Sequence, residues 1–136
     1  MKDCVFCKIA SGDIPCVKIW EDRKFLAFLD INPISKGMTL VIPKKHRHSN
    51  FFKNSSKDIS EIMIASKKVS KILENSLSID RVCVIIEGLE IDHLHIKLIP
   101  IRKGENLKTI LNSANETPDI KYLRNLALKI ISKNQA

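Results

Sequence analysis

One long segment of helical periodicity, set among short strand-like runs, most restricts what this 136-residue chain can fold into. Apolar residues recur at helical spacing down to about Leu77, after the helix-start residues Ser56 and Asp58. The short apolar runs are typical of strands, and they cover residues 17–21, 25–30, 38–42, 81–86 and 93–99. Because the connections are mostly short, this order favours an antiparallel α+β domain over an alternating parallel one.

The length of the chain suits one hydrophobic core and is too short for two. No internal repeat, low-complexity linker or composition break divides the sequence. A turn-like segment at 22–24 predicts a hairpin between the first two strands. A second helix is predicted near the end, with Thr117 as its N-cap and Pro118 at its first helical position.

Whether the cysteines form disulfides or stay as free thiols depends on the cellular compartment of the protein. No stretch reaches the roughly 18 apolar residues of a membrane span, and Asp3 and Asp13 interrupt the N-terminal region, which does not resemble a signal peptide. We therefore expect a cytoplasmic protein without a membrane partner, in which thiols stay reduced. Cys4 and Cys7 are then candidates for metal ligands or a redox pair rather than for a structural disulfide.

The formal net charge of +8 draws the molecule towards polyanions without saying which. Aromatic residues make up only 5% of the chain, too few for a platform on which single-stranded nucleic acid stacks. A zinc-finger spacing, with a second Cys or His pair on a helix, is also missing. We therefore do not expect nucleic acid as a partner.

The four histidines fall in two places along the chain. His46 and His48 follow the third predicted strand, and His93 and His95 lie in the last one. Strand side chains alternate between faces, so His93, His95 and Lys97 are expected to share one face. A bare His-x-His pattern is short, and a half-exposed strand face explains it as well as a functional pair does.

The Cys4-x-x-Cys7 pair has the spacing at which two sulfurs bind one tetrahedral ion. A thioredoxin-like redox pair would lie between a strand and a helix, and no strand is predicted before this one. Two unliganded cysteines at a frayed terminus are the other alternative. Zinc would need two more ligands, and histidine supplies the remaining strong nitrogen donors. The presence of both patterns in one short chain favours a shared site.

Residues 88–100 read Gly-Leu-Glu-Ile-Asp-His-Leu-His-Ile-Lys-Leu-Ile-Pro. This segment resembles the His-x-His-x-His signature of the histidine triad (HIT) family, with Lys97 in place of the third histidine. Three more blocks resemble those of the family and stand in its order, at residues 4–15, 28–33 and 37–46.

The resemblance implies a HIT-like α+β fold, in which an antiparallel sheet of about five strands carries a central helix and an additional C-terminal helix. It covers about residues 3–102. Residues 1–104 are accordingly predicted to form a HIT domain, and residues 105–136 a C-terminal helical extension of the same domain. Members of the family usually form homodimers, and the resemblance implies the same here.

The resemblance also implies a reaction. The middle histidine of the motif, His95, is the family's nucleophile, and it attacks the α-phosphorus of a nucleotide to form a nucleotidyl-histidine. A neutral imidazole suits this task and leaves readily once it is protonated. Lys97 can pair with a phosphate oxygen. Glu90 stands where the family's Gln-Ser or Gln-Glu contacts the leaving group, and it completes the predicted catalytic set.

The remaining roles follow from the same resemblance. Asp30 matches the carboxylate that bonds the ribose hydroxyls, and Phe28 and Ile31 match residues around the purine base. One structural zinc ion per chain is implied, with His48 as a second-ranked alternative ligand. The implied zinc ligands are Cys4, Cys7, His46 and His93.

Two functions remain as candidates. The first is a nucleotide hydrolase or nucleotidyltransferase that acts at the α-phosphorus of a purine nucleotide derivative. The alternative is a nucleotide-binding regulatory protein with little or no turnover, in which Lys97 holds a product-like phosphate. The presence of His95 favours catalysis, whereas the loss of the third histidine favours the regulatory protein.

Overall fold

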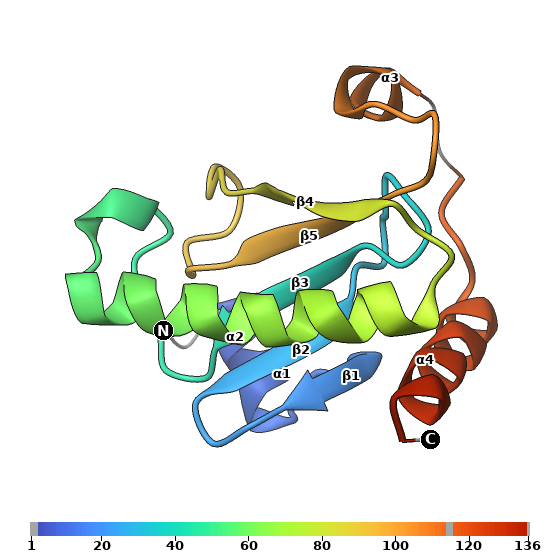
Figure 1. The fold of residues 1–136 in the computed structure, drawn as a ribbon. Coiled ribbons are helices and arrows are strands. Elements are labelled where there is room, and N and C mark those ends of the chain that lie inside the picture. The colour runs from blue at the N-terminus through green and yellow to red at the C-terminus, as the bar shows by residue number, and fades with distance from the viewer. Residues whose placement is uncertain (1–2, 114–115, 136) are drawn as a thin grey trace.

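The structure is a computed structural model that describes residues 3–113 and 116–135, and five strands of these residues form one antiparallel sheet (Figure 1). The order of the strands across the sheet is β1-β2-β3-β5-β4. Their bounds are β1 Lys18–Glu21, β2 Phe25–Leu29, β3 Thr39–Pro43, β4 Arg81–Ile85 and β5 Ile96–Ile101. The predicted α+β architecture, an antiparallel sheet of five strands with a central helix and an additional C-terminal helix, is confirmed.

The helices lie on both faces of this sheet. The long helix α2 crosses one face, α1 lies on the opposite face, and α4 packs at the end of α2 (Figure 1). Their bounds are α1 Val5–Ser11, the short 3-10 helix η1 Phe51–Lys53, α2 Ser56–Ser76, α3 Leu107–Asn112 and α4 Ile120–Gln135. None of these helices has the length and apolar character needed to cross a lipid bilayer.

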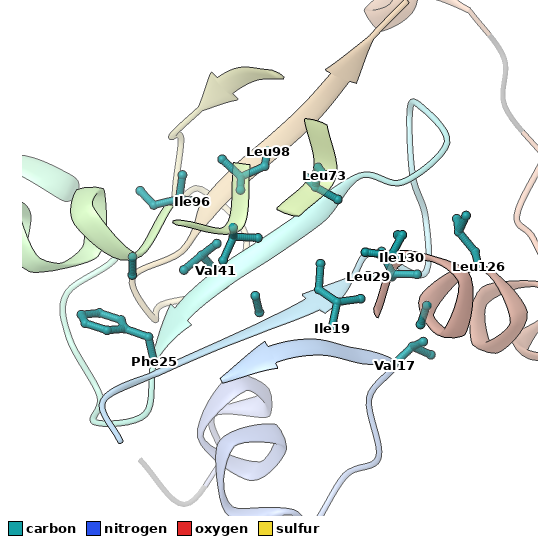
Figure 2. Close-up of a cluster of buried hydrophobic side chains, with 14 of the residues drawn as sticks. Val17, Ile19, Phe25, Leu29, Val41, Leu73, Ile96, Leu98, Leu126 and Ile130 are labelled. Atoms are coloured by element: carbon teal, nitrogen blue, oxygen red, sulfur yellow. The ribbon is translucent and has the colours of Figure 1, made fainter. Parts of the chain in front are cut away.

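The main hydrophobic core lies between the sheet and α2. Alternate residues of the strands point towards this helix, among them Leu29, Val41 and Leu98, and they pack with Leu73 of α2 (Figure 2). Helix α4 closes the end of the same core with buried side chains at Leu123, Leu126, Ala127 and Ile130. The predicted division of the chain at residue 104 stays a prediction, and its outer ends, residues 1–2 and 136, lie outside the described residues.

A second, smaller apolar cluster lies on the other face of the sheet. Phe6 of α1 packs there against Phe28, Leu40 and Ile42, which are the residues that alternate with those of the main core. This face of the sheet carries the cavity described below, and Phe6, Phe28 and Leu40 line it.

Two local predictions differ from the structure, and two short helices had no prediction. The last predicted strand, 93–99, is β5 at Ile96–Ile101, because the ladder with β3 ends at the pair Val41–Ile96. The N-cap of α4 is Asp119 rather than Thr117, since a carboxylate oxygen of Asp119 accepts a hydrogen bond from the Tyr122 backbone N–H at 2.7 Å. Helices α1 and α3 were not predicted, because each is too short to show a helical period.

Candidate metal centre and nucleotide cavity

Two cysteines and two histidines from distant parts of the chain form one cluster. The ligand atoms of Cys4, Cys7, His46 and His93 all lie within 4.8 Å of one another. The Nδ1 atom of His93 is 3.3 Å from Cys4 Sγ and 3.4 Å from Cys7 Sγ, and His46 Nδ1 is 3.4 Å from Cys7 Sγ. Tetrahedral zinc with ordinary bond lengths would separate sulfur from nitrogen by about 3.5 Å. The four donors therefore fit a tetrahedral metal ion.

Helix α1 brings the two sulfurs together. Cys4 is the N-cap of this helix, and its sulfur accepts a hydrogen bond from the Cys7 backbone N–H at 3.4 Å. The two residues are therefore one helical turn apart and project to the same side. The pair therefore lies at the start of a helix rather than on an irregular terminus, and its metal-free or metal-bound state stays a prediction.

The loop that carries His93 is held against the loop that carries His46. The Leu94 backbone N–H donates to the Arg47 carbonyl at 2.9 Å. Gly88 lies so close to Ser49 that a Cβ atom there would be 2.2 Å from the Ser49 carbonyl oxygen, and its φ is +65°. Only glycine meets both conditions without strain. His48 does not join the cluster, because its Nδ1 accepts from the Asn50 backbone N–H at 3.0 Å.

The protonation of the His93 ring suits a metal ligand. Its Nε2 lies 2.8 Å from the Pro43 carbonyl oxygen, which can only accept, so the ring proton is on Nε2 and Nδ1 faces the sulfurs. Burial lowers the pKa of His93, which favours the neutral ring. Burial and the adjacent Cys4 thiol raise the pKa of Cys7, so a metal must displace a proton from that thiol.

His95 follows two residues later and is oriented differently. Its Nδ1 lies 2.7 Å from the His93 carbonyl oxygen, so Nδ1 carries the proton and Nε2 has a free lone pair. The Phe6 ring packs edge-on against the imidazole, with 5.1 Å between the ring centroids. Both His93 and His95 are buried, so the interpretation of this segment as a half-exposed strand face is wrong. Burial lowers the pKa of His95 and keeps its ring neutral.

One cavity of about 590 Å³ unites the residues predicted for catalysis and nucleotide binding. This volume falls within the usual range of small-molecule sites. The six predicted residues that line it are Phe28, Asp30, Ile31, Glu90, His95 and Lys97. The predicted metal ligands belong to the separate cluster, which adjoins the cavity through the His93–His95 backbone.

Asp30 is held at the cavity wall by its own loop. One of its carboxylate oxygens accepts from the Asn32 backbone N–H at 2.8 Å, and its backbone N–H donates to the Met38 carbonyl at 3.0 Å. The side chain is half-buried, and its second carboxylate oxygen forms no hydrogen bond with a described residue. That oxygen is available to a hydroxyl donor on a ligand.

Glu87 was not among the predicted site residues; its carboxylate accepts a hydrogen bond from Lys97 Nζ, and the residue also lines the cavity. The bond to Lys97 lowers the pKa of Glu87, so the two side chains form an ion pair. The sequence carries no local signal for this pair, because it depends on the register of β4 and β5: Ile85 is paired with Lys97, and strand alternation turns Glu87 to the same face.

Comparisons with known proteins give matches over most of the chain. A family model described as the HIT domain matches residues 11–104. The adenosine 5′-monophosphoramidase of Schizosaccharomyces pombe is 43% identical over 99 residues, which are 71% of this chain and 73% of that protein. A HIT-like protein of Methanocaldococcus jannaschii is 37% identical over 107 residues, covering 75% of this chain and 81% of its own length.

A solved structure is similar to this one over nearly the whole chain. The zinc-bound histidine triad family protein of Mycobacterium smegmatis superimposes with a TM-score of 0.80 at 28% identity. The superposition covers 97% of this chain and 93% of that one. The comparison therefore includes the C-terminal helices, which lie beyond the family model.

Proposed function

Because the chain belongs to the histidine triad family, we propose that it is a nucleotide hydrolase or nucleotidyltransferase that acts at the α-phosphorus of a purine nucleotide derivative. The observation that carries the proposal is the hydrogen bond from His95 Nδ1 to the His93 carbonyl oxygen at 2.7 Å. This hydrogen bond holds the ring proton on Nδ1, so the lone pair of Nε2 is available as a nucleophile. His95 shares its cavity with Asp30 and Lys97, which suit a ribose and a phosphate.

The reaction proceeds in two displacements. In the first, the Nε2 lone pair of His95 forms a bond to the α-phosphorus, and the bond from phosphorus to the leaving group breaks. The leaving group departs with the electron pair and takes up a proton from solvent. In the second, water or another acceptor attacks the phosphorus and releases its proton to solvent, the P–N bond breaks, and its electrons return to Nε2. Lys97 Nζ donates to the phosphate oxygens as their charge develops.

Glu90 is the candidate contact for the leaving group or the acceptor. It lies at the exposed rim of the same cavity, outside the Lys97–Glu87 ion pair. A carboxylate there accepts a hydrogen bond from a leaving amine or an attacking water. Its place at the rim is consistent with an acceptor that enters from solvent.

The cluster of two cysteines and two histidines is proposed to hold one structural zinc ion per chain. Four protein ligands close the coordination sphere, so the metal would tie α1 and the loops of His46 and His93 together rather than meet substrate. His95 would gain a rigid neighbour, since its Nδ1 bonds the backbone of a ligand residue. These ligands require reduced thiols, and we therefore also propose a cytoplasmic location.

A homodimer is part of the same proposal. Strand β4 lies at one edge of the sheet and has β5 as its partner on one side. Val84 of this strand is 42% exposed. A sheet edge with exposed apolar side chains suits pairing with a second copy of the chain.

Direct assay tests the proposed function. Purified protein would be incubated with adenosine phosphoramidate and, separately, with a dinucleoside tetraphosphate, and the products followed by chromatography. Release of a nucleoside monophosphate supports the proposal and identifies the leaving group. If neither compound is turned over, while AMP still binds, the nucleotide-binding regulatory protein becomes the better description.

We expect Asp30→Ala to weaken ribonucleotide binding and to remove the preference for ribose over deoxyribose. Hydrogen bonds to a charged acceptor contribute about 1.5–3 kcal/mol each, so the loss should be at least about 10-fold. Calorimetric titration with AMP and dAMP measures both effects. Asp13→Ala, which removes an exposed carboxylate outside the cavity, is the matched control. Equal affinity of wild type and Asp30→Ala for AMP would exclude the ribose role.

We expect Lys97→Ala to lower the rate of turnover by about 10²-fold while some activity remains, because one donor to the transition-state charge is lost. The substitution also leaves Glu87 unpaired in the cavity, where its charge would repel phosphate. The double variant Lys97→Ala/Glu87→Ala separates these causes in steady-state assays. If it recovers the wild-type rate, the Lys97 role is wrong; Lys103→Ala controls for loss of a surface cation.

A further inference from the structure

The far end of the nucleotide cavity is built by the C-terminal segment. Leu111 of α3 and Ile120 and Arg124 of α4 line the same cavity as Asp30 and His95. These three residues lie beyond residue 104, where the match to the HIT domain model ends. The family's motif residues therefore form only part of the wall, and the C-terminal helices supply the rest.

The wall from this segment is apolar and open. Ile31 is 60% exposed, Leu111 52% and Ile120 49%, and all three line the cavity. Large apolar side chains that converge while exposed on one cavity indicate a ligand surface. A flat aromatic group placed among them would bury their exposed area.

Arg124 stands on a firmly packed helix. The preceding residue, Leu123, is buried in the main core, as are Leu126 and Ile130 further along α4 (Figure 2). At the other end of the helix, the Asn134 side-chain amide donates to the Ile72 carbonyl of α2 at 3.0 Å. The backbone at Arg124 is therefore fixed relative to the sheet.

The start of α4 lies at the ribose end of the cavity rather than at the phosphate end. The Thr117 hydroxyl donates to the Asn32 side-chain oxygen at 3.2 Å, two residues beyond Asp30. The phosphate would lie at His95 and Lys97, and the ribose at Asp30. In a nucleotide the base is attached to the ribose opposite the 5′-phosphate. The base would therefore reach the wall formed by Ile31, Ile120 and Arg124.

Resting on the proposed function, we propose that α3 and α4 form the base-binding wall of the cavity and that Arg124 selects guanine over adenine. Arg124 forms no hydrogen bond or ion pair with any described residue, so its donors are available. Guanine presents two adjacent acceptors, O6 and N7, which match paired guanidinium donors. Adenine presents a donor, its N6 amino group, beside N7, and an arginine opposite it leaves one donor facing another.

The test is calorimetric titration of wild type and Arg124→Ala with GMP, IMP and AMP. We expect wild type to bind GMP and IMP about 10-fold more tightly than AMP, since one good bidentate contact discriminates by about that much. In Arg124→Ala the three affinities should become equal, with AMP binding nearly unchanged. Lys129→Ala removes another exposed cation of α4 and should keep the wild-type preference.

The outcomes separate this inference from the proposed function. If all three nucleotides bind and Arg124→Ala does not change their ratio, base selection by Arg124 is wrong while the nucleotide site stands. An equal loss of GMP and AMP affinity in Arg124→Ala would also overturn it, because the side chain would then contact a group common to both. If none of the three binds to wild type, the proposed function itself fails. Melting curves and zinc content show whether each variant is folded.

Discussion

Replacement of His95 by alanine is expected to abolish turnover and to leave nucleotide binding nearly intact. In the proposed mechanism the imidazole supplies the electron pair that forms the bond to phosphorus, and no other described residue lining the cavity is a histidine. Loss of a nucleophile typically lowers kcat by at least about 10³-fold. The affinity for AMP should change little, because the ribose and base contacts belong to other residues.

Detection of the covalent intermediate provides a second test of the His95 prediction. Brief exposure of wild type to substrate, followed by an alkaline quench and mass spectrometry, should show a nucleotidyl adduct on the peptide that contains His95. Acid should remove the adduct, since a phosphoramidate bond is acid-labile. The His95→Ala variant should show no adduct.

Two comparisons keep the His95 prediction open to contradiction. His48→Ala removes an exposed histidine outside the cavity and should retain wild-type activity. His95→Gln fills more of the buried space than alanine and should be equally inactive if the defect is chemical rather than structural. A wild-type adduct on a different residue would show that the nucleophile has been assigned wrongly.

Loss of the metal centre is expected to have the largest effect on stability. Cys4→Ser and Cys7→Ser each remove one of the four proposed ligands, which would join α1 to the loops of His46 and His93. If free zinc is about 1,000-fold above its Kd, binding stabilises the fold by about 4 kcal/mol. The melting temperature should therefore fall by roughly 10 °C.

Elemental analysis of protein expressed with zinc should find one ion per chain in wild type and almost none in either variant. A chelator should lower the melting temperature of wild type towards that of Cys4→Ser and leave the variant unchanged. Cys83→Ser alters a half-buried thiol outside the cluster and should keep its zinc. The ligand assignment is wrong if Cys4→Ser retains a full complement of zinc.

Most of the secondary structure could be predicted because it depends on local periodicity. The helix expected from Ser56 to about Leu77 is α2 at Ser56–Ser76, with Ser55 as its N-cap. Four of the five strands agree with prediction to within one or two residues at each end. The fifth, β5, begins three residues later than predicted, since hydrogen bonding to β3 and not apolar alternation decides where a ladder ends.

The sequence by itself determined the kinds of chemistry available. The Cys-x-x-Cys spacing, the paired histidines and the HIT-like motif together indicated a tetrahedral metal site and a nucleotide site. The structure places all four predicted metal ligands in one cluster, and the six other predicted residues in one cavity. Residue type and spacing were enough to predict both sites, because the chemistry of a ligand depends on its residue type and the order of motifs can be read from the sequence.

Only the tertiary structure decided how these groups are oriented and what surrounds them. His93 and His95 are two residues apart, yet their rings have different partners. The His93 ring faces the cysteine sulfurs, whereas the His95 ring is hydrogen-bonded to the His93 carbonyl. Neither the Lys97–Glu87 ion pair nor the place of Arg124 in the cavity wall followed from a local pattern. Such arrangements depend on contacts between distant segments, as between Cys4 and His93, which are 89 residues apart. The packing of loops and helices on the sheet sets these contacts, and no short stretch of sequence encodes them.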